Sequence, residues 1–217
     1  MRVGVICEGH TDRAVIVNVL KGIKSLDSSD IIAIRPIADY DETDLANIPK
    51  DQFSTWSEVK RECEEREKIR NFLNIEGQEN VVVHFDSCES DDFGVGKPTK
   101  DDNYATNLRA SVVAKMDEWL QGEFVDEIIH AVAVEEIEAW VLTIYEKKDS
   151  SNSASPKEKL QRVLGQKDIT YNHDYNGFLK ISKAFTKLKN FKKEKYRSYN
   201  DSLNEFCTEV EEKIKIS

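Results

Sequence analysis

The stretch Val3-Gly4-Val5-Ile6-Cys7-Glu8-Gly9-His10-Thr11-Asp12, residues 3–12, decides the fold class. Residues 3–7 are apolar and rich in β-branched side chains, which is typical of a buried strand in a parallel sheet. Two acids follow at once, and apolar residues spaced between positions 14 and 23 then predict a helix with a broad apolar face. We expect Thr11 to cap this helix and Gly9 to permit the tight turn before it.

The rest of the chain repeats this alternation. Further strands are predicted at residues 31–37, 81–85 and 127–134, and Pro36 indicates an edge position for the first of them. Helices are predicted at residues 56–73, 104–120, from 135 onward, 156–164, 178–189 and 198–214, with Pro156 at the first position of its helix. The order predicts an α/β fold: a mostly parallel sheet flanked by helices, with a helical C-terminal extension.

The predicted domain organisation follows from a change of composition along the chain. Residues 149–156 are polar and low in complexity, so we expect a linker or surface loop there. It separates an α/β domain, residues 1–148, from a helical basic region, residues 157–217.

Composition excludes several classes of protein. A chain that is 39% hydrophobic and 9% aromatic is too apolar to be disordered. No apolar run approaches the roughly 20 residues that cross a bilayer, and the N-terminal residues do not resemble a signal peptide, so we expect a cytoplasmic protein without membrane contact. The four cysteines lack zinc-site spacing, which favours reduced thiols.

Charge is divided unevenly along the chain. The net charge of −10 argues against binding nucleic acid through broad electrostatic attraction. Residues 1–150 carry a net charge of −15, however, whereas residues 151–217 carry +5. Carboxylates and cations are therefore segregated.

Acidic residues follow three of the predicted strands. They are Glu8 and Asp12 after the first, Asp86, Glu89, Asp91 and Asp92 after the third, and Glu135, Glu136 and Glu138 after the fourth. The carboxyl ends of parallel strands form one edge of a sheet, where ligands bind at a topological switch point. Carboxylates that converge there raise one another's pKa unless a cation such as Mg²⁺ neutralises them. Mg²⁺ held by two or three carboxylates is the usual apparatus of phosphodiester chemistry.

Three motifs, in order, carry a resemblance to a known family. EGxTD at residues 8–12, VVVHFD at 81–86 and EEIEAW at 135–140 resemble a TOPRIM domain, the metal-binding fold of topoisomerases, bacterial primases, RecR repair proteins and OLD-family nucleases. The chain is similar to small stand-alone bacterial TOPRIM-like proteins, in which EEIEAW and a helical C-terminal tail recur. The resemblance covers about residues 1–145.

The resemblance implies roles for individual residues. Glu8 would be a metal ligand or general acid/base, Asp12 a second acid, and Asp86 the first acid of a DxD metal motif. Cys88 stands where the second acid of DxD belongs, so Glu89, Asp91 or Asp92 would supply the missing oxygen. Glu136 or Glu138 would be the later acid of OLD-type sites, and their i, i+2 spacing prevents both from facing one way on a helix. A lysine that stabilises the pentavalent phosphate would be Lys180 or Lys183.

The expected site follows from these roles. The catalytic residues are Glu8, Asp12 and Lys183, and Mg²⁺ or Mn²⁺ is bound by Glu8, Asp12, Asp86, Glu89, Glu136 and Glu138. Alternatives stay open, because acids in a first helical turn also stabilise the helix dipole, and Cys88 can be read as a nucleophile without an identifiable base. His84 and His130 are predicted to be structural histidines, and the three tryptophans to be core residues.

The basic stretch from 180 to 197 supplies a candidate nucleic-acid interface. Its expected contacts are Lys180, Lys187, Lys189, Lys192, Lys193 and Arg197. The interleaved aromatics, among them Phe178, Phe185 and Phe191, would stack on single-stranded bases if exposed. The alternative is an ordinary amphipathic helix whose lysines face water.

The sequence therefore predicts a metal-dependent nuclease that hydrolyses phosphodiester bonds in DNA or RNA, with DNA the favoured partner. The resemblance places such proteins in phage-defence or mobile-element modules, often beside an ATPase. This chain has no Walker A motif, so a nucleotide-driven step would need a separate ATPase subunit. The alternatives are a non-catalytic regulatory or interaction subunit, which Cys88 favours, and a phosphotransfer enzyme acting on small nucleotides.

Overall fold

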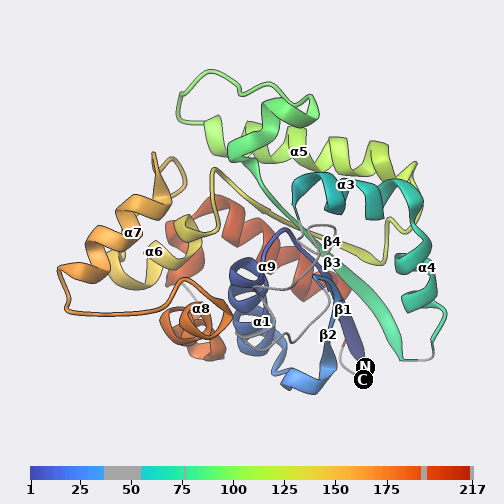
Figure 1. Ribbon diagram of the computed structural model, residues 1–217, viewed down its shortest axis with the longest axis horizontal. Coiled ribbons are helices and arrows are strands. Elements are labelled where there is room, and N and C mark those ends of the chain that lie inside the picture. The colour runs from blue at the N-terminus through green and yellow to red at the C-terminus, as the bar shows by residue number, and fades with distance from the viewer. Residues whose placement is uncertain (37–54, 76, 192–194, 216–217) are drawn as a thin grey trace, which may run out of the picture.

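Four parallel strands form the centre of the protein. The computed structural model describes residues 1–36, 55–75, 77–191 and 195–215 (Figure 1). The strands β1 (Arg2–Ile6), β2 (Ile31–Arg35), β3 (Gln78–Asp86) and β4 (Ile128–Ala133) are ordered β2-β1-β3-β4, and every neighbouring pair is parallel. The predicted α/β fold is thereby confirmed. β2 lies at an edge of the sheet, as Pro36 indicated.

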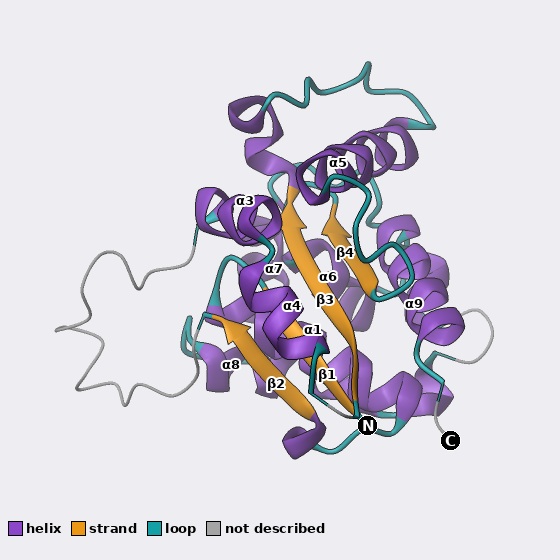
Figure 2. Ribbon diagram, turned by 90° about the vertical axis from the view of Figure 1, so that its right-hand side faces the viewer, coloured by secondary structure: helices purple, strands orange, loops and turns teal. Residues whose placement is uncertain are grey.

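Alternate side chains of the strands point into two hydrophobic cores, one on each face of the sheet. Val5, Val82 and Ile129 face α1, whereas Val83 and Val132 face α5. The first face is covered by α1 (His10–Lys24), α6 (Glu138–Glu146), α7 (Pro156–Gly165), α8 (Tyr175–Ile181) and α9 (Asp201–Lys213). The second is covered by α3 (Trp56–Glu65), α4 (Glu67–Leu73) and α5 (Tyr104–Leu120). Figures 1 and 2 show this layering, with the sheet between α1 and the pair α3 and α5.

Several predicted helix boundaries are corrected. The helix predicted over residues 56–73 is two helices that meet at Arg66, whose φ is 58° and whose guanidinium donates to the carbonyl oxygen of Trp119. The helix predicted over 178–189 ends at Ile181, and two 3₁₀ turns follow, η4 (Lys183–Thr186) and η5 (Leu188–Asn190). Ser182, at that end, uses its hydroxyl to satisfy the carbonyl oxygen of Phe178. In each case side-chain contacts end the helix earlier than the apolar periodicity alone predicts.

Two helix starts are also corrected. α1 begins at His10, so Gly9 is its N-cap rather than Thr11. Gly9 has φ −134°, which any residue adopts, but a Cβ there would lie 2.9 Å from Oδ2 of Asp12. The helix predicted from residue 198 begins at Asp201, where the Asn200 side chain accepts a hydrogen bond from the N–H of Leu203.

The C-terminal helices share a core with the rest of the chain. Phe178 and Phe206 pack in the same cluster as Val5 and Val82, and Phe206 stacks on Trp140 with ring centroids 5.3 Å apart. A Cβ at Gly22 would overlap the carbonyl oxygen of Phe185, so this glycine lets η4 approach α1. The helical C-terminal region thus forms part of one layer of the α/β fold.

The connection at residues 149–156 is partly buried. Ser150, Ser151 and Ser153 are buried, and the hydroxyl of Ser150 donates to the carbonyl oxygen of Ala139 at 2.7 Å. The Asn200 amide in turn donates to the Ser150 hydroxyl. These contacts pack the segment, which joins α6 to α7, against Ala139 of α6 and against Asn200, the residue before α9.

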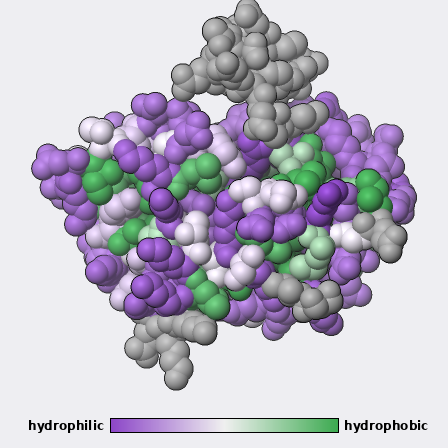
Figure 3. All heavy atoms as spheres, turned by 90° about the horizontal axis from the view of Figure 1, so that it is seen from below, coloured by the Kyte–Doolittle hydropathy of each residue, from purple (hydrophilic) through white to green (hydrophobic). Residues whose placement is uncertain are grey.

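Surface properties complete the description of the fold. None of the helices in the described residues is long and apolar enough to cross a membrane. On the face that Figure 3 shows, hydrophobic residues lie in small groups among hydrophilic ones. Scattered apolar residues of this kind are normal for a protein surface.

A charged cluster fastens α9 to the sheet. Glu209 accepts hydrogen bonds from the backbone N–H of His130 on β4, at 3.0 Å, and from Arg109 on α5, at 2.7 Å. The His130 ring lies between Glu209 and Asp117. His130 is therefore a structural histidine, as predicted. Burial alone would raise the pKa of Glu209, but the contacts with His130 and Arg109 lower it to about 2.

We predict that Glu209→Gln destabilises the protein at pH 7 by roughly 3 kcal/mol, because a folded-state pKa below the unfolded value stabilises the ionised protein. This contribution is present above about pH 4.5 and is lost as the pH falls toward 2. Urea unfolding of wild type and variant across this range measures the difference. The exposed Glu205→Gln on the same helix is the control, and a pH-independent difference for Glu209→Gln would contradict the prediction.

Candidate functional site

Glu8 and Asp86 lie at the topological switch point of the sheet. The chain passes from β1 to β2 on one side and then returns to place β3 on the other side of β1, so the carboxyl ends of β1 and β3 flank the point of reversal. Glu8 follows β1 after Cys7, and Asp86 ends β3. The backbone N–H of Asp86 donates to Oε1 of Glu8 at 2.8 Å. The first two predicted acids are therefore neighbours.

Helix starts bring three further acids to the same edge. Asp12 lies in the first turn of α1 and Glu138 is the first residue of α6, and both are buried. Glu136 precedes α6, and its Oε2 accepts a hydrogen bond from the backbone N–H of Lys157. The charges of Asp12, Glu136 and Glu138 all raise the pKa of Asp86. We call Glu8, Asp12, Asp86, Glu136 and Glu138 the acidic cluster.

The expectation that helical spacing keeps Glu136 and Glu138 from facing one way does not apply here. It assumed that both residues belong to one helix, but α6 begins at Glu138. Glu136 therefore lies in the turn between β4 and α6, where helical periodicity does not apply. Both carboxylates act on Asp86.

Burial and mutual repulsion shift the acidic cluster toward its protonated form. Burial raises the pKa of Glu8 to about 8, and the charge of Asp86 adds to this effect. Burial likewise raises the pKa of Glu138 to about 7, with the charges of Glu136 and Asp12 contributing. The pKa of Asp86 is raised well above its usual value, first by burial and then by Asp12. Full ionisation of the cluster is unfavourable unless a cation offsets its charge.

His84 is a site residue that the sequence analysis assigned only a structural role. It is fully buried, and its Nε2 lies 3.3 Å from Oδ1 of Asp86. Neither ring nitrogen, nor that carboxylate oxygen, makes a well-aligned hydrogen bond within the described residues. The charge of His84 lowers the pKa of Glu8. The i, i+2 spacing of His84 and Asp86 on a strand was the available signal, since it places both on one face.

Glu89 and Lys183 lie apart from the acidic cluster, whereas Cys88 lies close enough for Asp86 and Glu136 to raise the pKa of its thiol. Glu89 is exposed on η3 (Ser87–Phe93), and the strongest effects on the Asp86 pKa come from other acids. Cys88 donates its backbone N–H to the carbonyl oxygen of Glu135, and burial raises the pKa of its thiol to about 12, which argues against a thiolate nucleophile. Lys183 is exposed on η4, which packs near Gly22, whereas Asp12 lies toward the other end of α1.

Two basic residues beside the acidic cluster were not predicted. The charge of Lys157 lowers the pKa of Glu138, and Nε2 of the half-exposed His173 lies 3.8 Å from Oε1 of Glu138. Both belong to the C-terminal region, which reaches the cluster only through its packing against α6 and α1. No local sequence signal connects them with acids that lie more than 15 residues away.

The basic stretch divides between the core and the surface. Phe178, Phe185 and Phe191 are buried in the core, so the expectation that these phenylalanines stack on bases is wrong. Arg197 donates to Asn204, Thr208 and Glu211, which ties it to α9. Exposed positions in the basic stretch include Lys180, Lys183, Lys187 and Lys189. Lys192 and Lys193 lie outside the described residues.

The donor chemistry of the acidic cluster fits a hard divalent cation. Its donors are carboxylate oxygens, and Oδ1 of Asp86 is buried without a hydrogen-bond partner in the described part of the chain. No three His, Cys, Asp or Glu side chains among the described residues are arranged closely enough to hold one ion. The residues thus supply suitable ligands, but their side chains do not meet at one coordination point.

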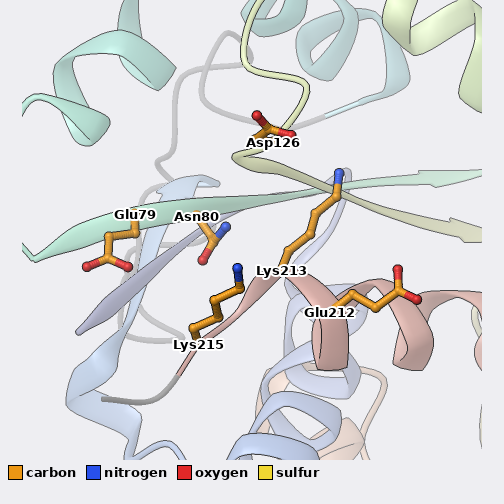
Figure 4. Close-up of a pocket in the computed structure, with 6 residues that line it drawn as sticks. All are labelled: Glu79, Asn80, Asp126, Glu212, Lys213 and Lys215. Atoms are coloured by element: carbon orange, nitrogen blue, oxygen red, sulfur yellow. The ribbon is translucent and has the colours of Figure 1, made fainter.

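A surface hollow lies at the opposite edge of the sheet. It has a volume of about 490 Å³, and Figure 4 shows the side chains that line it: Glu79, Asn80, Asp126, Glu212, Lys213 and Lys215. Lys213 there donates to the carbonyl oxygens of Val125 and Ile128. The hollow is therefore separate from the acidic cluster, and Lys213 caps the amino end of β4.

Comparison with known proteins leaves the family open. No protein-family profile matches the chain, and neither curated proteins nor solved structures give a significant match. The TOPRIM resemblance therefore rests on the three sequence motifs.

We predict that Glu8→Gln stabilises the protein in EDTA at pH 8 by roughly 1–3 kcal/mol, because the amide removes a charge that is costly to bury. Its oxygen can still accept from the N–H of Asp86. Since the folded pKa of Glu8 is raised to about 8, the wild type loses stability as the pH rises from about 4.5 toward 8, and the gain shrinks on acidification.

Urea unfolding at pH 5 and pH 8 measures this effect. The exposed Glu65→Gln serves as the control and should change stability by less than about 0.5 kcal/mol. A Glu8→Gln variant that is less stable than wild type at pH 8 would show that the acidic cluster is not under electrostatic strain.

Proposed function

We propose that this protein is a divalent-metal-dependent nuclease of the TOPRIM-like type, which hydrolyses phosphodiester bonds. The observation that carries the proposal is the gathering of the acidic cluster at the switch point, where the N–H of Asp86 holds Glu8. Five buried or half-buried carboxyl groups are more than the fold needs, and their repulsion costs stability. Clusters of charged groups that lower the stability of a protein in this way are found chiefly at catalytic or ligand-binding sites.

The acidic cluster would bind Mg²⁺ or Mn²⁺ through Glu8, Asp86 and Asp12, with Glu136 or Glu138 completing the set. A bound divalent cation would supply charge that polarises the phosphodiester and stabilises the leaving oxygen. His84 lies within 3.3 Å of Asp86 and is positioned to orient its carboxylate. If Glu8 is not a metal ligand, it would suit the role of general acid or base, since burial raises its pKa to about 8. Lys157, whose charge lowers the pKa of Glu138, is our candidate in place of Lys183 for the lysine that meets a phosphate oxygen.

The partners and setting belong to the same proposal. DNA is the favoured substrate, and the exposed lysines 180, 183, 187 and 189 offer contacts for its backbone. We place the protein in the cytoplasm, in a phage-defence or mobile-element module, with any ATPase supplied by another subunit. These assignments follow the sequence resemblance.

A cleavage assay tests the proposal. Purified protein is incubated with single- and double-stranded DNA and RNA, and with free nucleotides, in Mg²⁺, Mn²⁺ or EDTA. We expect polynucleotide cleavage only with metal, and a loss of at least about 100-fold in Glu8→Gln and Asp86→Asn, since each removes a charge from the metal set. Glu65→Gln, an exposed residue far along the chain, is the matched control.

Two outcomes would contradict the nuclease. Cleavage that persists in EDTA or in both acid variants would exclude the acidic cluster as the catalytic site. Turnover of free nucleotides with polynucleotides left intact would instead support phosphotransfer on small nucleotides.

One observation favours a second candidate function, a non-catalytic regulatory or interaction subunit. Cys88 occupies the position of the second DxD acid, and in the described residues no ready-made metal-binding group is present. Calorimetric titration with Mn²⁺ separates the two: heat of binding that disappears in Asp86→Asn supports the nuclease. Absence of binding, together with stable association with a partner protein, supports the subunit.

A further inference from the structure

The carboxylate of Glu135 sits in a site built from three donors. The hydroxyl of Tyr104 donates to Oε1 of Glu135 at 2.6 Å, and Nζ of Lys97 lies 3.1 Å from Oε2. Nζ of Lys100 lies 3.8 Å from Oε1. We call Lys97, Lys100 and Tyr104 the loop anion site, because both lysines come from the loop that leads into α5. Figure 2 shows this loop beyond the carboxyl end of β3.

The backbone holds Glu135 in a costly conformation. Its φ is 62°, in the left-handed region, although it is not a glycine and does not end a helix. Such a conformation is disfavoured in a residue with a side chain. It is enforced from both sides, since the N–H of Glu135 donates to the hydroxyl of Ser87 at 2.8 Å and its carbonyl oxygen accepts from the N–H of Cys88. The backbone is therefore held in a disfavoured conformation that directs this carboxylate toward the three donors.

Exposure differs sharply across the loop anion site. The side chain of Lys100 is 69% exposed, that of Lys97 is 29% exposed, and that of Glu135 is 13% exposed. An anion that approaches from solvent thus meets the lysines before it meets the carboxylate. Burial would raise the pKa of Glu135, but the hydrogen bonds from Tyr104 and Lys97 lower it, so the group is an anion at neutral pH.

The loop anion site borders the acidic cluster. Glu135 and Glu136 are adjacent in the chain, yet Glu135 turns toward Tyr104 of α5 and Glu136 toward the start of α7. The two carboxylates therefore mark opposite faces of the same sheet edge. If a nucleic-acid backbone crosses this edge, one of its phosphates would lie near Lys97 and Lys100. The neighbouring phosphodiester groups would then lie near the acidic cluster.

We infer that the loop anion site binds a phosphate of the nucleic-acid backbone, and that the Glu135 carboxylate holds it closed in the free protein. This inference rests on the proposed nuclease function, for which it supplies a substrate contact. A backbone phosphodiester carries one negative charge and two non-bridging oxygens, as a carboxylate carries one charge and two oxygens, so it can accept from the same donors in place of Glu135. Lys97 and Lys100 would then contact the phosphate of the substrate instead of the Glu135 carboxylate.

Binding of labelled oligonucleotides in Ca²⁺, followed by fluorescence anisotropy across a salt series, tests the inference. We expect a Lys97→Met, Lys100→Met double variant to bind about tenfold more weakly, and its salt dependence to fall by about one phosphate contact. Glu135→Gln should bind about three- to tenfold more tightly, because it releases both lysines. On the same α5 side of the protein, Lys115→Met and Glu118→Gln break a comparable lysine–glutamate pair and are the matched controls.

Inorganic pyrophosphate provides a readout that does not depend on nuclease activity. Calorimetry should detect tighter pyrophosphate binding in Glu135→Gln than in wild type, and loss of that gain when both lysines are also replaced. If Glu135 only tethers the loop, Glu135→Gln will lower the melting temperature without improving any anion affinity, and the inference is overturned.

The outcomes also separate this inference from the proposed function. Wild-type binding that survives unchanged in the double lysine variant overturns the loop anion site alone. If wild type binds none of the oligonucleotides, the nuclease proposal fails and the inference that rests on it fails too. Cleavage in Mn²⁺ by a double lysine variant of normal affinity supports the nuclease while excluding this contact.

Discussion

The parallel pairing of β1 with β3 is the constraint on which the site depends. It places the carboxyl ends of both strands at one edge, so Glu8 and Asp86 become neighbours joined by a backbone hydrogen bond. The two helices that start there, α1 and α6, bury this pair and add Asp12 and Glu138. Each added carboxylate makes ionisation of the others harder, and burial strengthens the repulsion because it removes solvent screening. The acidic cluster is thus a direct consequence of the topology.

Sequence patterns predicted this part of the structure well, because its determinants are local. Apolar runs such as 81–85 form strands wherever both faces are covered, and an acid directly after a strand is carried to the sheet edge. Strand order and the exact starts of helices were not encoded locally. The start of α6 illustrates this: a shift of a few residues decides whether helical geometry applies to Glu136.

Residues that reach the site through tertiary packing could not be predicted in this way. Lys157 and His173 approach Glu138 only because α7 and α8 pack against α6 and α1, and apolar periodicity does not specify which helices become neighbours. The break at Arg66 has the same origin, since contacts with Trp119 and Glu123 from a distant part of the chain hold its guanidinium. His84 was read as a satisfied core residue, whereas its ring nitrogens lack aligned partners and face the acid beside it.

The burial of phenylalanines in the basic stretch limits the ways in which this stretch can contact the phosphates of the proposed substrate. With Phe178, Phe185 and Phe191 buried, these side chains are unavailable for base stacking, whereas the exposed lysines of this stretch contribute charge. Charge alone is poorly selective and is screened within about 10 Å at moderate salt. Under the proposed function, specific placement of a phosphodiester would come from groups with fixed geometry at the sheet edge. Glu135 has such a geometry: its backbone is held at a positive φ, and Tyr104, Lys97 and Lys100 surround its carboxylate. It directly precedes Glu136 of the acidic cluster.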